Sequence, residues 1–356
     1  MKIVKNLFII FLVTLLFSCD LFLGQDADKS PEGVLYSLWK SFDERHAYID
    51  IKMGINPNFN NWNEVYEHYN NQLTTGKTDL FHACGDMLNE LADPHVVLYD
   101  SSGNAISLDA SYFSYRKTSA VNEKTELIRM ARDRLTGRGI VVGNNDMIYG
   151  TFISAPHIGY LYISNFTDVF NWVERIDVIV DYLKKNTDKV IIDIRYNYGG
   201  ASPVVEFIAS RFASVYTNFS ISSVKNGPGR NDFSLPTVSV VKPSDNSYTK
   251  PIIILTNKAT ISAAEWFTLA LRTQPHVTHV GTNTQGALSM VTMHPMINGW
   301  YYSVSAYKVT DMQGRCYEGF GVKPHVEITG EENTSWVINP DTQLMAVLDW
   351  LLKETK

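Results

Sequence analysis

The sequence has 356 residues, of which 45% are hydrophobic, 12% aromatic and 19% charged, a composition that indicates one large or two modest globular domains. The formal net charge is -6, and the sequence shows no dense cluster of Lys and Arg. Because phosphate binding requires such a cluster, we exclude a nucleic-acid-binding protein.

The first residues predict an export signal. Two lysines precede an apolar run over residues 7–17, which is short for a bilayer span and typical of the hydrophobic region of a signal peptide. The run ends in Leu-Phe-Ser-Cys19, which is similar to the bacterial lipobox, so we expect Cys19 to carry a lipid anchor. Residues 1–19 are then the lipoprotein signal peptide and 20–30 a polar tether, and the protein is anchored outside the cytoplasm on the bacterial cell envelope. An ordinary cleaved signal or an apolar anchor is the alternative.

The next part of the chain predicts a helical domain over residues 31–100. Ser30 followed by Pro31 is a helix start, with a capping hydroxyl and a proline in the first turn, and the helix should continue towards Arg45. Further helices are predicted over 62–73 and 79–91. The connecting segment 101–150 is mixed and contains one expected helix, over 123–135.

Short apolar strands alternate with helices from Gly139 onwards, which predicts an α/β domain over residues 151–356. The expected strands cover 158–163, 190–195 and 252–255, and the expected helices follow Asp168, follow Ser202 and begin near Ser262. Asn298-Gly299 predicts a tight hairpin, 342–352 a last helix, and the stretch 226–249 a long surface excursion.

Metal and disulfide signals are weak. Cys84 and Cys316 have an uninformative spacing, which favours two small core residues although an exported location would permit a bridge. His276 and His279 form a lone HxxH within a predicted strand, and we interpret them as structural rather than as zinc ligands. We therefore expect no metal and no cofactor.

Three separate segments carry residues suited to catalysis. The apolar strand of residues 190–195 runs through a polar turn into Gly199-Gly200, a pair that can direct backbone N–H groups into a cleft. Ser262 falls at a helix N-terminus, where free N–H groups and the macrodipole favour negative charge, although an N-capping serine has the same signature. Glu318 lies among glycines ahead of a Val-x-Pro sequence, which alone indicates only a loop.

Together these segments resemble the tail-specific, or C-terminal-processing, serine peptidases. The shared features are a strand ending in Asp-x-Arg-x-Asn-x-Gly-Gly, a Thr-x-Ser-Ala-x-Glu sequence at Ser262, and Glu-Gly-x-Gly-Val-x-Pro from Glu318. The stretch 159–166 is similar to the first strand of the family's catalytic domain, and Leu-Ala-Asp-Pro-His95 is similar to its Leu-x-Asp-x-His element. The resemblance implies a crotonase- or ClpP-like β/α spiral with an N-terminal helical cap domain.

The sequence departs from the better-known Ser-Lys branch of this family. Ala287 stands where that branch has its lysine, so the resemblance shifts to the tricorn-core-like branch, in which a histidine acts as base. His95 and Glu318 match that branch, although His95 could also be a structural histidine.

His325 replaces the family's aspartate after Val-x-Pro, and we find no PDZ-like insert. Arg195 is expected to brace the strand end rather than to act on substrate.

The resemblance implies a serine endopeptidase of exported proteins or peptides. Ser262 would attack the carbonyl carbon, His95 would transfer the proton, and Glu318 would support the imidazole. The expected oxyanion donors are the N–H groups of Gly199, Gly200 and Ala263. Two alternatives keep the same fold: a non-catalytic ligand-binding protein, and a hydrolase acting on amide or ester bonds of the cell wall.

Overall fold

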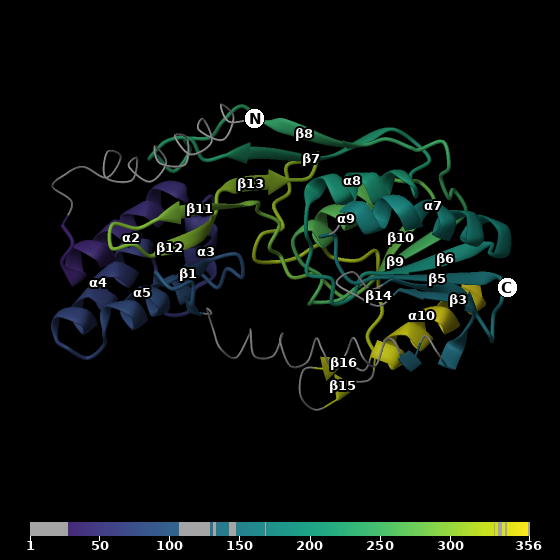
Figure 1. Ribbon diagram of the computed structural model, residues 1–356, viewed down its shortest axis with the longest axis horizontal. Coiled ribbons are helices and arrows are strands. Elements are labelled where there is room, and N and C mark those ends of the chain that lie inside the picture. Colours follow the sequence, from purple (N-terminus) through teal and green to yellow (C-terminus); the bar gives the residue numbers. More distant parts are fainter. Residues whose placement is uncertain are drawn as a thin grey trace, which may run out of the picture. The chain divides into compact units, whose positions relative to one another are not determined.

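The computed structural model describes residues 28–106, 129–130, 133–141, 147–167, 169–330, 332–333, 337–338 and 340–354. The chain forms two compact units, which differ in architecture (Figure 1). The first comprises Met1–Asp109, Lys225–Phe233 and Val291–Ala306, and the second comprises Ala110–Val224, Ser234–Met290 and Tyr307–Lys356. The signal peptide, most of the tether and Cys19 lie outside the described residues. None of the helices in the described ranges is both long and apolar enough to span a bilayer.

Four helices lie in the described part of the first unit. They are α2 (Pro31–Arg45), α3 (Ile49–Ile55), α4 (Trp62–Thr74) and α5 (Leu80–Asn89). Three of them match the predicted helices, and α2 begins as expected, with the Ser30 hydroxyl accepting a hydrogen bond from Gly33 N at 3.1 Å. The short α3 was missed because it has only 7 residues and Tyr48 provides no side-chain cap.

A four-stranded sheet adds to these helices in the order β11-β12-β1-β2. Its strands are β1 (Val97–Tyr99), β2 (Ala105–Ile106), β11 (Val291–Pro295) and β12 (Tyr301–Ser305). β11 and β12 form the hairpin predicted at Asn298-Gly299, with Gly299 at a φ of 85°. β12 pairs with β1, so a hairpin from the C-terminal half of the chain completes the helical segment.

The second unit is organised around a seven-stranded sheet of order β14-β10-β9-β6-β5-β4-β3. The strands are β3 (Leu135–Val141), β4 (Met147–Phe152), β5 (Ile158–Ile163), β6 (Lys189–Asp193), β9 (Ile252–Thr256), β10 (Val277–Gly281) and β14 (Val326–Glu327). The five strands from β14 to β5 are parallel, and β4 and β3 run antiparallel at one edge. All residues of β5 and β9 are buried, as expected for strands covered on both faces.

Helices cover both faces of this sheet (Figure 1). They are α7 (Val169–Asn186), α8 (Ser202–Ser210), α9 (Ala263–Arg272) and α10 (Pro340–Glu354). Ile179, Ile208 and Phe267 belong to one apolar core cluster, whereas Leu344 and Leu348 of α10 belong to a second, on the opposite face. The predicted α/β class is confirmed, and the spiral topology and the cap role stay predictions.

Two smaller sheets complete the second unit. β13 (Tyr307–Thr310), β7 (Thr217–Val224) and β8 (Thr237–Val241) form one, and β15 (Glu332–Asn333) and β16 (Val337–Ile338) form the other. β8 lies within the stretch 226–249, so this stretch, most of whose residues are exposed or partly exposed, contains a strand that its Pro, Ser and Asn content did not predict. The expected helix over 123–135 falls mostly outside the described residues, and its last residue, Leu135, begins β3.

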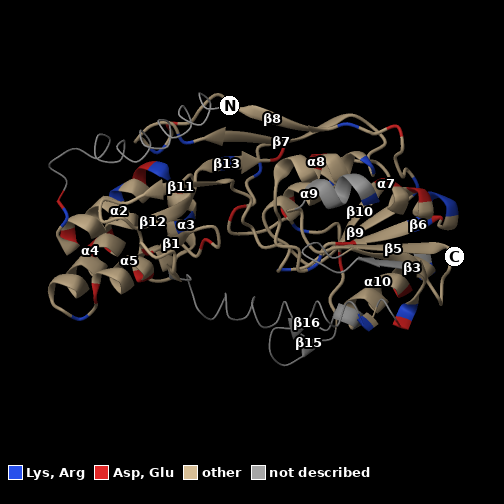
Figure 2. Cartoon of the chain, viewed as in Figure 1, with Lys and Arg blue, Asp and Glu red and all other residues tan. Residues whose placement is uncertain are grey.

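The charged residues of the described ranges are interspersed along helices and loops, whereas the strands of the larger sheet carry few of them (Figure 2). Acidic and basic residues are mixed along α2 and α7. This mixed pattern is consistent with the absence of a basic stripe in the sequence.

Candidate active site

Ser262 occupies a strained position between β9 and α9. It has a φ of 60° and a ψ of -125°, in a region that residues with a Cβ atom rarely adopt. The capping serine of α2, Ser30, instead has a φ of -59° and a ψ of 157°. Ser262 is therefore more than an ordinary helix cap, since such strain persists only where surrounding structure enforces it, and it is concentrated at functional sites.

A buried carboxylate enforces this conformation. Glu265 Oε2 accepts hydrogen bonds from Ser262 N at 3.1 Å and Ala287 N at 2.8 Å. Its Oε1 accepts from Thr284 Oγ1 at 2.5 Å and Gly286 N at 2.7 Å. Glu265 therefore joins the turn at Ser262 to the loop at residues 284–287. Burial raises its carboxyl pKa, although all four hydrogen bonds favour the ionised form.

Glu265 had no predicted role, although it ends the Thr-x-Ser-Ala-x-Glu sequence. The spacing Ser-x-x-Glu is a capping-box signature, which could have predicted the hydrogen bond to the Ser262 N–H group. The bonds to residues 284–287 could not have been predicted, because no local pattern links segments about twenty residues apart.

The Gly199-Gly200 turn packs directly against Ser262. A Cβ atom on Gly199 would lie 2.8 Å from Ser262 Cβ and 2.7 Å from Ala263 N, and its φ of 84° also disfavours a side chain. A Cβ atom on Gly200 would lie 2.3 Å from the carbonyl group of Phe166. Both glycines are required because other backbone segments approach too closely for a side chain.

The three predicted oxyanion donors differ in their hydrogen bonding. Gly199 N already donates to Asn197 Oδ1 at 2.8 Å. Gly200 N donates to no group in the described part of the chain, and Ala263 N is the first N–H group of α9, which has no partner within a helix. Gly200 and Ala263 are therefore the two available donors, and Gly199 contributes close packing.

Glu318 lies against the same loop that Glu265 holds. Its side chain is fully buried, and Oε2 accepts a hydrogen bond from Leu288 N at 3.0 Å. The neighbouring Gly319 N donates to Gly286 O at 2.7 Å. The loop of residues 284–288 thus connects the surroundings of Ser262 with those of Glu318.

His95 belongs to the first unit, whereas Ser262 and Glu318 belong to the second. Its backbone is bonded on both sides: His95 N donates to Asp93 Oδ1 at 2.9 Å, and His95 O accepts from Ser303 Oγ at 2.7 Å. Within the second unit the structure brings together Ser262, Ala263 and the glycine turn. The role of His95 stays a prediction.

Residues 157–328 match the family model described as peptidase family S41. The chain contains a peptidase family S41 domain. This range includes Ser262, Glu318 and the glycine turn, and it begins with the residue before β5. The predicted resemblance to the C-terminal-processing peptidases is thereby confirmed.

Two curated relatives are carboxy-terminal processing proteases. The chain is 25% identical over 176 residues to the carboxy-terminal processing protease CtpB of Bacillus subtilis, covering 49% of this chain and 35% of the relative. It is 27% identical over 171 residues to CtpA of the same organism, covering 48% and 35%. The matched part thus spans about a third of the length of these relatives.

Solved structures extend the similarity beyond the S41 domain. A protein of Parabacteroides merdae, provisionally classed as a peptidase, is 27% identical with a TM-score of 0.72, covering 91% of this chain and 98% of its own. Mature CPAF has a TM-score of 0.64 at 14% identity, covering 91% and 96%, and shows likeness of fold alone. The family and its relatives support the predicted enzyme class, a serine-type peptidase.

Arg195 braces the S41 domain as predicted. It is fully buried at the end of β6, where Nε donates to Asp193 Oδ1 at 2.9 Å and Nη2 to Asp193 Oδ2 at 2.6 Å. Tyr160 donates to the same carboxylate at 2.8 Å, and Arg195 Nη1 reaches Gln343 of α10 at 3.2 Å. These contacts tie together β5, β6 and α10 of the second unit, of which α10 lies beyond the matched residues 157–328.

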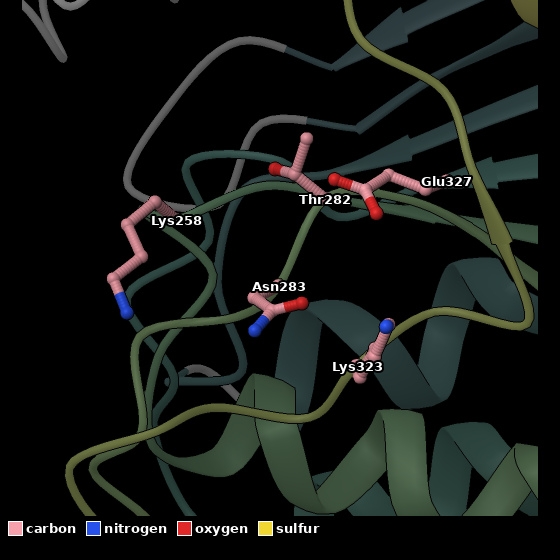
Figure 3. Close-up of a pocket in the computed structure, with 5 residues that line it drawn as sticks. All are labelled: Lys258, Thr282, Asn283, Lys323 and Glu327. Carbon is pink, nitrogen blue, oxygen red and sulfur yellow. The ribbon is translucent and has the colours of Figure 1, made fainter.

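A polar depression of about 350 Å³ lies at the carboxyl ends of β9 and β10 in the S41 domain. Figure 3 shows Asn283 between the side chains of Lys258 and Lys323, with Thr282 and Glu327 on the adjoining wall. Lys258 Nζ donates to Thr284 O at 3.3 Å and Gln285 O at 3.2 Å. These contacts hold Lys258 against the loop of residues 284–287, which argues against its use as a base.

The cysteines and the HxxH histidines have structural surroundings. Neither Cys84 nor Cys316 forms a disulfide bond within the described residues, and Cys84 is buried. His276 bonds to the Ser214 hydroxyl at 3.1 Å, and His279 bonds to Thr256 Oγ1 at 2.7 Å. Across the described ranges, no group of three or more His, Cys, Asp or Glu side chains could hold a metal ion.

Proposed function

We propose that this chain is a serine endopeptidase that hydrolyses peptide bonds in exported proteins or peptides, with Ser262 as the nucleophile. The observation that carries the proposal is the positive φ of Ser262 at the N-terminus of α9. A capping serine needs no such strain, whereas a nucleophile exposed on a sharp strand-to-helix turn does.

The surroundings of Ser262 suit acyl transfer. Attack on a carbonyl carbon generates an oxyanion, which preorganised N–H donors stabilise. Ala263 N and Gly200 N are available for that purpose, and the N-terminus of α9 adds its dipole. One such donor contributes roughly 10²–10³ to kcat in other serine hydrolases.

The proposal assigns the base to His95 and its support to Glu318. A serine hydroxyl needs an oriented base, and Ala287 replaces the lysine of the Ser-Lys branch. The backbone contacts of His95 and the burial of Glu318 support these assignments, since both residues are held by their own surroundings.

Covalent labelling and turnover test the nucleophile directly. A fluorophosphonate probe should add once to the wild-type protein and not to Ser262→Ala, and Ser262→Ala should lose hydrolysis of an unfolded fluorogenic protein substrate. Ser30→Ala is the matched control, because it removes a true helix cap and should cost about 1 kcal/mol of stability without loss of turnover. Full turnover in Ser262→Ala would overturn the proposal. Probe labelling together with hydrolysis of cell-wall amides or esters, but not of peptides, would favour the cell-wall hydrolase.

The base is tested with single and double variants. His95→Ala should remove most turnover, and combining it with Ser262→Ala should cost little more, because members of one catalytic unit are strongly non-additive. Activity should rise through mildly acidic pH, as expected for a histidine base. Loss of activity in Lys258→Ala or Lys308→Ala, with full activity in His95→Ala, would instead assign the base to a lysine.

A further inference from the structure

Three ionisable side chains are buried together inside the first unit. His46 follows α2, Lys52 lies in α3 and Asp93 lies in the loop before β1, and their exposed fractions are 3%, 2% and 2%. Ionised groups removed from water cost several kcal/mol unless they are paired and hydrogen-bonded. The charge state of each member therefore follows from its partners.

The hydrogen bonds fix His46 in its neutral form. Tyr48 N donates to His46 Nδ1 at 3.1 Å, so Nδ1 carries no proton and the ring proton is on Nε2. His46 Nε2 then donates to Asp93 Oδ2 at 2.9 Å. Burial also lowers the pKa of His46, against the opposing effect of Asp93 and with the help of Lys52 and Arg230.

Asp93 is the anion of the cluster and Lys52 its balancing cation. Burial raises the pKa of Asp93, but the charge of Lys52, the hydrogen bond from His46 and the proximity of His95 together hold it below the ordinary value. The neutral imidazole contributes a hydrogen bond and no charge, so the ionised form of Asp93 depends on Lys52.

The second oxygen of Asp93 acts on the backbone of His95. Oδ1 accepts from His95 N at 2.9 Å, and Asp93 O accepts from Val96 N at 3.0 Å. On the other side, the Ser303 hydroxyl donates to His95 O at 2.7 Å and accepts from Val97 N at 2.9 Å. The two oxygens of Asp93 thus link the buried cluster to the residue that the proposed function uses as base.

We infer that Asp93 is a positioning residue for His95, kept in place as a carboxylate by Lys52 and His46. The inference rests on the proposed function of His95. Residue 93 must be a carboxylate because each of its two oxygens accepts a hydrogen bond, one from His46 Nε2 and one from His95 N. In Asp93→Asn, one of the two sites is occupied by an NH₂ group, which faces a donor, and the attraction between the Lys52 charge and the carboxylate is lost.

The test separates positioning from stability. Asp93→Asn should lower kcat about 10- to 100-fold with little change in KM, and shift the acid limb of the pH–rate profile to lower pH, because an imidazolium loses a neighbouring negative charge. The double variant Lys52→Met, Asp93→Asn removes the uncompensated cation and should recover thermal stability but not kcat. Recovery of kcat together with stability would show a purely structural role and overturn the inference.

Asp100→Asn is the matched control. Asp100 Oδ1 accepts from Ser102 N at 2.8 Å, two residues ahead, as Asp93 Oδ1 does from His95 N, but in an exposed turn. This variant should keep the wild-type kcat and pH profile. If His95→Ala is inactive while folded Asp93→Asn keeps wild-type kcat and pH profile, the inference is wrong and the proposed function stands. Full activity in His95→Ala overturns both.

Discussion

The replacement of Glu265 by Gln tests the connection between the Ser262 turn and the loop of residues 284–287. The carboxylate accepts four hydrogen bonds, three of them from backbone N–H groups that the substitution leaves in place. An amide has one acceptor oxygen, and its NH₂ group must face the remaining donors. The least costly orientation places the NH₂ group at Thr284, whose hydroxyl can rotate to accept, and leaves Gly286 N without an acceptor.

Two effects of opposite sign set the magnitude. A buried N–H group without a partner costs about 1–3 kcal/mol, and the remaining bonds weaken because they no longer involve a charge. Burial raises the pKa of Glu265, which shows that ionisation itself opposes folding, so the neutral amide recovers part of this loss. We expect a net decrease of about 1–3 kcal/mol in the free energy of unfolding, and a 10- to 100-fold decrease in kcat because the Ser262 turn loosens.

Urea denaturation and steady-state kinetics measure both quantities. Glu206→Gln is the control, since burial also raises the pKa of Glu206 but its side chain accepts no hydrogen bond from any described residue. It should keep wild-type kcat and equal or slightly greater stability. Wild-type stability together with wild-type kcat in Glu265→Gln would refute the view that this carboxylate holds the Ser262 turn.

Three further predictions concern Gly200, His279 and Cys19. Gly200→Ala should yield little folded protein or a strongly lowered melting temperature, because the new Cβ atom would lie 2.3 Å from the Phe166 carbonyl; a wild-type melting temperature would contradict the tight approach. Burial lowers the pKa of His279 well below 6.5, so the unfolded chain takes up its proton first and stability falls as pH drops below about 6.5. Between pH 7.5 and 5.5 this residue should contribute a loss of about 1.4 kcal/mol in urea denaturation, which His279→Asn should abolish; an unchanged pH dependence would count against it. Cys19→Ser should release the protein from membranes or leave the signal uncleaved, as judged by fractionation and mass spectrometry, and wild-type processing and fractionation would end the lipoprotein proposal.

Local sequence patterns were sufficient for most of the described helices and for the central strands β5, β6 and β9. The capping signal at Ser30, the continuous apolar strands near Ile158 and Ile252, and the Asn298-Gly299 turn each predicted an element close to its observed bounds. These signals work because capping, strand burial on two faces and tight turns depend on residues within one segment. The strand β8 within the 226–249 surface stretch was missed because it forms only by pairing with β7, and its composition alone resembles a loop.

The sequence by itself determined the motifs on which the proposed chemistry rests, since Ser262, the Gly199-Gly200 pair and Glu318 are each recognisable within a few neighbouring residues. Only the tertiary structure decided how these motifs are supported. It commits the Gly199 N–H to Asn197, joins Glu265 to the loop of residues 284–287, and buries Asp93 with Lys52 and His46. Hydrogen-bond partners drawn from distant segments are chosen by packing and by the cost of leaving a buried donor or charge unpaired, and no local pattern encodes that choice.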